Sequence, residues 1–146
     1  MSPLDNLPLI SAVTATLAAQ VLKVILVLLT ERRWAFDRML ETGGMPSSHS
    51  ATVTSLAVTI GMVEGFGSTI FALAIVFAGI VMYDASGIRR AAGMHAQLIN
   101  DLVQELAHLF DEGFQPTALK TLLGHTYPQV IVGSLLGGVT GLLIAL

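Results

Sequence analysis

The chain has 146 residues, of which 53% are hydrophobic and only 12% are charged. A typical soluble domain is about 25% charged, so this chain has too few charges to cover its surface in water. The net charge of −3 argues against nucleic acid as a partner, and the absence of cysteine excludes disulfides, thiolate metal sites and cysteine nucleophiles. We therefore expect residues 1–146 to form a single membrane-embedded domain.

The first half of the chain contains three apolar runs. Residues 7–29 are long enough to cross a bilayer, which takes about 20 residues, and the run ends near Trp34 and several arginines, as membrane boundaries often do. Two shorter runs, 51–63 and 69–83, are joined by a tight turn at 64–68. We interpret these two runs as a helical hairpin through the membrane.

The second half contains one amphipathic stretch and one more apolar run. In residues 84–112, apolar positions recur with helical spacing and charged positions lie between them. We predict a helix that lies at the membrane interface or packs on the bundle. After a break at 124–128, residues 129–146 form the last apolar helix. The predicted fold is all-α, a membrane bundle of about four hydrophobic helices plus one amphipathic interfacial helix.

The last apolar helix is rich in glycine. Three of its glycines lie four residues apart: Gly133, Gly137 and Gly141. Small residues at this spacing allow helices to approach closely in lipid. This spacing would therefore also allow a homo-oligomer formed through this helix.

The basic residues predict how the chain is oriented in the membrane. Six of them fall in the first connector or in the long third one: Arg32, Arg33, Arg38, Arg89, Arg90 and Lys120. The turn at 64–68 has none. By the positive-inside rule, both basic connectors, and the polar groups gathered on them, face the cytoplasm.

Residues 43–50, with the sequence Gly-Gly-Met-Pro-Ser-Ser-His-Ser, are the first candidate site. The two glycines permit close backbone approach to a ligand, and Ser47 or Ser48 could cap a helix that starts near Pro46. The N–H groups and dipole of that helix would attract an anion, and His49 in its first turn could donate a proton to it. A plain loop followed by a serine cap explains the same residues.

Further candidate anion ligands lie elsewhere in the chain. Arg89 and Arg90 could hold a phosphate, with Asp84 orienting one of them, although an ordinary cationic stop signal is the alternative. Lys23 lies about two turns inside the first apolar run, where a charge costs a few kcal/mol, so we expect it to point towards a partner or an anion.

Histidines supply the candidate nucleophile. His125 is followed four residues later by Gln129, which could orient one ring nitrogen and leave the other free. His95 is a rival for the same role. Glu105 and His108 have the spacing of half a di-iron site, but the sequence has one copy only, so we expect no metal.

Residues 43–51, 83–90 and 124–126 occur together in this order. This set resembles the divergent short branch of the type-2 phosphatidic acid phosphatase and vanadium haloperoxidase superfamily, over nearly the whole chain. The resemblance implies a phosphatase that needs no cofactor. It implies His49 as general acid, Arg89 or Arg90 as phosphate ligand and His125 as nucleophile. Gln129 stands where the superfamily has an acid, and no Arg-Pro pair follows Lys23.

Together, the residues and the resemblance predict a membrane phosphatase that hydrolyses a lipid phosphate monoester or diphosphate through a phosphohistidine. Lys23, Ser47 and Ser48 would join the arginines in binding the phosphate. The alternative is a non-catalytic membrane protein that binds an anionic lipid or a partner through the same cationic site. A small transporter or channel subunit is a third reading, suggested by Lys23 and the last helix.

Overall fold

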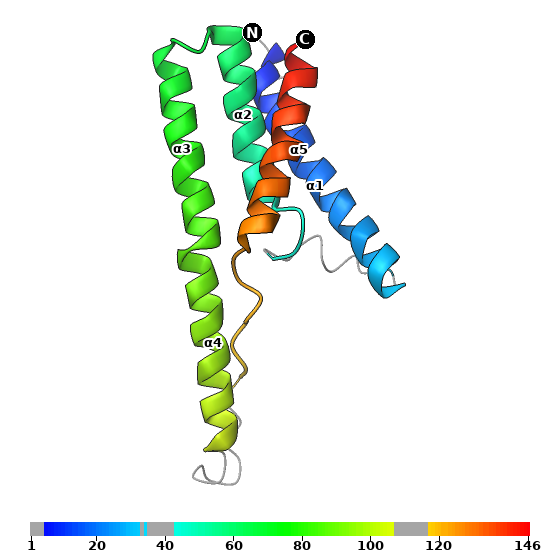
Figure 1. Ribbon diagram of the computed structural model, residues 1–146, viewed down its shortest axis with the longest axis vertical. Coiled ribbons are helices and arrows are strands. Elements are labelled where there is room, and N and C mark those ends of the chain that lie inside the picture. The colour runs from blue at the N-terminus through cyan, green and yellow to red at the C-terminus, as the bar shows by residue number, and fades with distance from the viewer. Residues whose placement is uncertain (1–4, 33, 35–42, 107–116) are drawn as a thin grey trace.

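The computed structural model describes residues 5–32, 34, 43–106 and 117–146. Its elements follow the order α1 (Leu7–Glu31), α2 (Ser48–Glu64), α3 (Thr69–Ser86), α4 (Ile88–Glu105) and α5 (Tyr127–Ala145) (Figure 1). The predicted all-α fold is confirmed for the residues described. The hairpin is present as α2 and α3, although α2 begins three residues before the apolar run because Ser47 caps it.

Three helical stretches are long and apolar enough to cross a membrane: Leu7–Glu31, Thr69–Glu105 and Tyr127–Ala145. α2 is not one of them. It has 17 residues, of which nine are buried, and it packs against α1, α3 and α5. Figure 1 shows it at the centre of the bundle. The neighbouring helices therefore shelter α2, which explains how it can carry many hydroxyl side chains.

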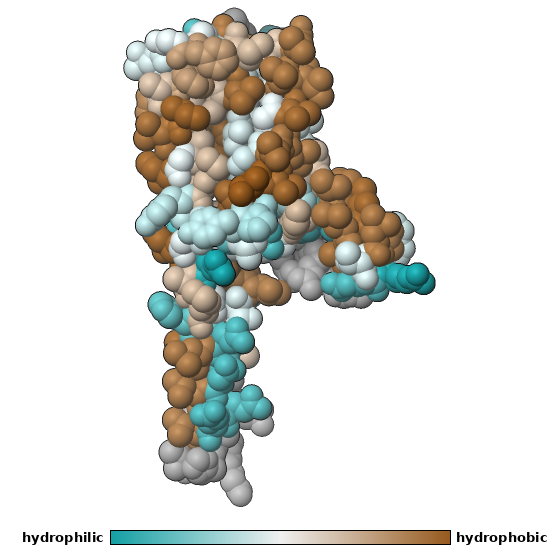
Figure 2. Space-filling model, viewed as in Figure 1, coloured by the Kyte–Doolittle hydropathy of each residue, from teal (hydrophilic) through white to brown (hydrophobic). Residues whose placement is uncertain are grey.

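The bundle is packed through small side chains and presents large ones outwards. Ala15, Ala19 and Ala51 form one buried cluster. Leu73 and Leu135, by contrast, are 64% and 65% exposed. Figure 2 shows hydrophobic residues over most of the visible bundle surface. This distribution suits a protein whose surroundings are lipid, because lipid gives no reason to bury large apolar groups and favours close contact between small ones.

Buried hydroxyl groups connect α1 to α2. Ser11 and Ser55 are hydrogen-bonded through their side chains, and Thr59 Oγ1 lies 2.7 Å from Ser11 Oγ. Nearer the start of α2, Thr16 Oγ1 lies 2.6 Å from Thr52 Oγ1. Each such bond is worth roughly 0.6 kcal/mol within a membrane, so the set fixes the register of the two helices.

The three evenly spaced glycines of α5 are buried against α2. A Cβ atom added to Gly141 would lie 2.7 Å from the carbonyl oxygen of Ser55, and one added to Gly137 would lie 2.8 Å from Ala51 Cα. The glycine face of α5 is thus filled by α2 of the same chain. A homo-oligomer remains a prediction, and it would have to use other residues of α5.

This packing predicts opposite outcomes for two adjacent glycines. Gly137→Ala places a methyl group on the backbone of Ala51 and should destabilise the protein by about 1–3 kcal/mol. Gly138→Ala is the matched control, because its Cβ would meet only the Thr54 methyl group, at 4.0 Å. Thermal unfolding in detergent should show a lower midpoint for Gly137→Ala alone. Equal midpoints would contradict the close α2–α5 contact.

The predicted amphipathic helix is present as α4. Of the two positions expected for it, at the membrane interface or packed on the bundle, the second does not fit the structure. Asp84 belongs to α3, and α4 continues the direction of α3 beyond the other helices after a joint at Gly87 (Figure 1). Of the helices described, only α3 contacts it. Packing on the bundle was therefore wrong. Leu98 and Leu102 are 59% and 46% exposed, and the predicted end near residue 112 lies outside the described residues.

Candidate functional site

The site lies where α2 and α5 begin and α3 ends. The Ser47 N–H donates to the carbonyl oxygen of Gln129 at 3.1 Å, which joins the start of α2 to the start of α5. The His125 N–H donates to the carbonyl oxygen of Ala85 at 2.8 Å, which joins the segment before α5 to the end of α3. Residues up to about 80 positions apart in the sequence therefore meet at one level of the bundle.

Ser47 is used as the cap of α2. Its side-chain oxygen accepts from the Ser50 N–H at 3.3 Å and from the Ser50 hydroxyl at 3.0 Å, and Ser47 is fully buried. Gly44, with φ of +92°, turns the chain into this loop in a conformation that favours glycine. Ser48 is the first residue of α2, so its N–H and that of His49 lie where a helix supplies no acceptors of its own.

The two motif histidines face each other. His49 is in the first turn of α2, His125 stands two residues before α5, and their ring centroids are 6.1 Å apart at an interplanar angle of 62°. His125 is only 2% exposed. His95, the rival candidate, is exposed on α4 and makes no contact with either ring among the residues described. The fold thus places His125, and not His95, beside His49.

Hydrogen bonds around Gln129 assign the tautomer of His125. The Thr126 N–H donates to Gln129 Oε1 at 3.1 Å, so this atom is an acceptor. The same oxygen lies 3.2 Å from His125 Nδ1, which must therefore carry the proton. His125 Nε2 then bears a free lone pair. It is buried and makes no hydrogen bond within 3.5 Å to the described residues, although the backbone of Gly44 lies near enough to the ring to raise the pKa of His125 against the effect of burial.

Lys23 reaches this site from α1. It is 2% exposed, and its aliphatic stem passes 3.5 Å from the position that a Cβ atom on Gly44 would take. A Cβ atom at Gly44 would make an ordinary contact with that stem, so the positive φ is the reason for glycine there. Lys23 acts on both histidines, because its charge lowers the pKa of His49 and of His125. That Lys23 points towards an anion stays a prediction, and the structure places its charge close enough to act on both histidines.

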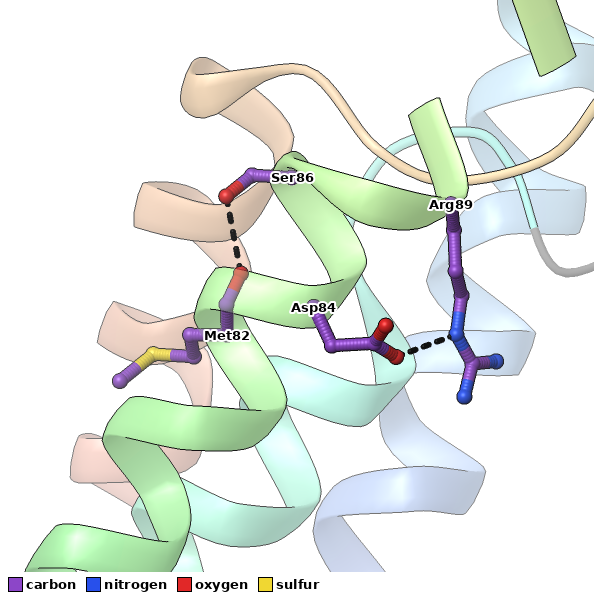
Figure 3. Close-up of polar contacts among 4 residues, drawn as sticks. All are labelled: Met82, Asp84, Ser86 and Arg89. Atoms are coloured by element: carbon purple, nitrogen blue, oxygen red, sulfur yellow. Dashed lines mark hydrogen bonds and ion pairs between the residues drawn. The ribbon is translucent and has the colours of Figure 1, made fainter. Parts of the chain in front are cut away.

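Arg89 approaches from the other side. Its Nε atom forms an ion pair of 2.6 Å with Asp84 Oδ2 at the junction of α3 and α4 (Figure 3), and the side chains are 48% and 33% exposed. Asp84 thus orients Arg89, as predicted for one of the two arginines. The Arg90 side chain is exposed, and no hydrogen bond or ion pair joins it to the other site residues described. Its backbone instead contacts Gly124.

The electrostatics of the site favour an anion. Burial lowers the pKa of His49, which lies outside the three membrane-crossing stretches, and the charges of Arg89 and Lys23 lower it further against a smaller opposing effect of Asp84. Burial also lowers the pKa of His125, while its hydrogen bond to Gln129 opposes this effect. The N-terminal dipoles of α2 and α5 add positive potential at the same place. A bound phosphate would neutralise this potential.

Some functional features were missed from the sequence. The Thr126–Gln129 capping box, which supplies the oxygen that orients His125, was readable from the pair Thr126-x-x-Gln129. The packing of Gly44 on Lys23 has no signal beyond the pair of glycines. Among the described residues, no group of three histidines or acids could hold a metal ion, and His108 of the weak half-site lies outside them.

Comparison with known proteins identifies the family of the chain. A family model described as "Divergent PAP2 family" matches residues 4–140. The chain is 40% identical over 155 aligned positions to the uncharacterized membrane protein YuiD of Bacillus subtilis (strain 168), covering 100% of this chain and 96% of that protein. No solved structure matches. With three membrane-crossing stretches and a match over nearly its whole length, the chain is an integral membrane protein that belongs to the divergent PAP2 family.

Proposed function

We propose that the protein is a membrane phosphatase that hydrolyses a lipid phosphate monoester or diphosphate through a phosphohistidine intermediate. One observation carries the proposal: His125 Nε2 is buried, makes no hydrogen bond within 3.5 Å to the residues described, and lies next to His49 within the field of Lys23. A buried, oriented and neutral imidazole beside cations is the arrangement that nucleophilic attack on a phosphate requires.

In the first step, phosphate oxygens are held by Lys23, by Arg89 and by the N–H groups in the first turn of α2. His125 Nε2 attacks phosphorus, so a P–N bond forms and the P–O bond to the lipid breaks. The phosphate charge raises the pKa of His49, which counters the lowering by Arg89 and Lys23, and His49 then protonates the leaving oxygen.

In the second step, a water molecule attacks phosphorus from the side that the lipid oxygen has left. His49, now neutral, accepts a proton from that water as the new P–O bond forms. The P–N bond breaks, inorganic phosphate leaves, and His125 regains its free lone pair. His49 therefore acts first as acid and then as base, and the site returns to its starting state.

The position of the site supports a lipid substrate. It lies at one end of the apolar bundle, where α2 and α5 begin, so a phosphate at the level of the lipid headgroups could reach it while the acyl chains stay in the membrane. Under the positive-inside rule, the basic residues of the two connectors favour the cytoplasmic side for this end.

Gln129 favours a second candidate function. Its amide orients His125 but carries no charge to stabilise the imidazolium that forms on attack, as a carboxylate would. A site that binds the phosphate group without turning it over, and so serves as an anionic-lipid binding protein, would need only the cations and the helix N-termini. Turnover separates the two functions.

The test is phosphate release by the purified protein in mixed micelles. The panel contains phosphatidic acid, a polyprenyl phosphate and a polyprenyl diphosphate, each with and without vanadate. Vanadate-sensitive release from at least one lipid, absent from a His125→Asn sample prepared in parallel, supports the phosphatase. Vanadate or phospholipid binding with no release from any lipid would support the binding protein instead.

The titration of His125 gives a prediction with a definite sign. Only the neutral ring can attack, and burial lowers the pKa of His125 below its ordinary value of 6.5. The low-pH fall in kcat/KM should therefore lie below pH 6.5. Gln129→Glu places a carboxylate on Nδ1 and raises that pKa, so the fall should move to higher pH. Gln104→Glu, on the exposed surface of α4, is the control. A profile that Gln129→Glu leaves unmoved would contradict the assigned contact.

A further inference from the structure

The segment that carries His125 has few bonds of its own. Residues 117–125, here called the strap, form no helix and run beside α4 (Figure 1). Its bonds to other backbone groups within the described residues are one from the Leu123 N–H to the carbonyl oxygen of Thr121, at 2.9 Å, and the bond from His125 to Ala85. An irregular segment of this kind needs other contacts to hold a buried side chain in place.

Asn100 supplies such a contact far from the site. Its Nδ2 atom donates to the carbonyl oxygen of Leu119 at 2.9 Å, and its Oδ1 atom accepts from the Leu119 N–H at 2.9 Å. A single side chain thus satisfies both backbone groups of one strap residue. This pairing fixes which residue of the strap lies opposite Asn100, because a shift by one position would break both bonds.

The strap lies on a face of α4 made of small residues. Gly93 and Ala96 are the buried positions of α4, and they share this face with Asn100 at intervals of three and four residues. A Cβ atom on Gly93 would lie 2.6 Å from the carbonyl oxygen of Thr121. At the other end of the strap, Gly124, with φ of +76°, sits against the backbone of Arg90. The strap therefore fits closely along α4.

The strap between the two anchors is short. From Ala85 to Asn100 the helices advance about 22 Å, at roughly 1.5 Å per residue. From Leu119 to His125 the chain can span at most about 20–22 Å, at roughly 3.3–3.6 Å per residue. The bond from Leu123 to Thr121 turns the strap within this span, so its contacts with the backbone of Gly93 and Arg90 on α4, and not full extension, set its path. Where Asn100 holds Leu119 therefore determines where His125 can lie.

We propose that Asn100 is a positioning residue, which acts through the strap to hold His125 against His49. The catalytic consequence rests on the proposed phosphatase function, but the structural claim does not. Asn100 touches neither histidine, and its effect runs from Leu119 along the strap to the bond between His125 and Ala85. Loss of the Asn100 bonds gives the strap freedom to slide and exposes the His125 ring.

The structural test is chemical modification of histidines by diethyl pyrocarbonate, followed by mass spectrometry of the peptides. His125 should react slowly in the native protein because it is 2% exposed, and exposed His95 is the internal reference. In Asn100→Ala, the rate at His125 relative to His95 should rise about tenfold or more, since two hydrogen bonds are lost. Gln97→Ala removes an exposed amide from the same helix and should leave the ratio unchanged. An unchanged ratio in Asn100→Ala would overturn the proposal.

Asn100→Asp is a second variant that keeps the fold closer to native. Its carboxylate still accepts from the Leu119 N–H but faces the Leu119 carbonyl oxygen without a proton to donate, so its labelling ratio should lie between native and Asn100→Ala.

The phosphatase assay gives a second, kinetic test. Asn100→Ala should lower kcat about tenfold and change KM less than twofold, because Lys23 and Arg89 are untouched. A raised KM with unchanged kcat would contradict a positioning role. If no lipid is hydrolysed at all, the phosphatase proposal fails, while the labelling ratio still decides the role of Asn100.

Discussion

His125→Asn should abolish phosphate release, with a loss in kcat of about four orders of magnitude or more. Removal of the nucleophile from a covalent mechanism has effects of this size, because the remaining binding groups cannot supply a new bond to phosphorus. Asparagine is the chosen substitute because its amide can still donate to Gln129 Oε1. The fold around the strap and the start of α5 should therefore survive.

The covalent intermediate gives a direct measurement for this variant. Wild-type protein mixed with a radiolabelled lipid phosphate and quenched in alkali should retain label on His125, since phosphohistidine survives alkali and is lost in acid. His125→Asn should retain none. His95→Asn, which changes an exposed residue of α4, is the matched control and should behave as wild type. Label retained by His125→Asn and lost from His95→Asn would transfer the nucleophile to His95.

His49→Gln should have the second-largest effect, and its size should depend on the substrate. Loss of a general acid costs about two to four orders of magnitude when the leaving group is an alcohol, which departs poorly without a proton. An aryl phosphate such as p-nitrophenyl phosphate releases a stable anion that needs no proton, so the loss in kcat should be much smaller. Glutamine is polar and of similar length, so the first turn of α2 should keep its packing.

The quantity to measure is the loss in kcat of His49→Gln with a lipid monoester, divided by its loss in kcat with p-nitrophenyl phosphate. Initial rates of phosphate release from a lipid monoester and from p-nitrophenyl phosphate, for wild type and His49→Gln, give it directly. Asp84→Asn is a useful comparison. Because Asp84 orients Arg89, its loss should lower the rate of phosphate release from both substrates by the same factor. Equal losses for the two substrates in His49→Gln would show that His49 binds phosphate and does not protonate the leaving group.

Much of the fold could be predicted because apolar run length and helical period are local properties of the chain. The hairpin of α2 and α3 and the last helix followed from these signals. For α4 the sequence left two places open, the membrane interface and the bundle, because periodicity shows that a helix has two unlike faces but not which face meets protein. In α4 the large residues Leu98 and Leu102 are exposed, while Gly93 and Ala96 are the buried positions. Small residues carry little weight in a hydrophobic pattern.

The site residues were predicted best where a residue carries a free-energy cost that only a function would explain. Lys23 inside an apolar run and a histidine in the first turn of a helix both stand out for this reason. Arg90 was a weaker case, because adjacent arginines on a helix point in different directions and one sequence cannot say which faces inwards. Asn100 gave no signal, since a polar residue on the wet side of an amphipathic helix is expected whatever its contacts.

The central position of α2 has a consequence for how the protein enters the membrane. A helix whose inner side carries Ser11-bonded and Thr16-bonded hydroxyls is a poor candidate for insertion by itself. It would enter the membrane paired with the strongly apolar α3. Its other edge, at Ala51 and Ser55, is covered only when the glycines of α5 pack against it. Because α5 follows α4 in the chain, biosynthesis would leave that edge facing lipid until α5 has been made. The seam that completes the bundle is also the one that brings the start of α5 to the start of α2, so a chain that stops short of α5 would have neither a closed bundle nor a site.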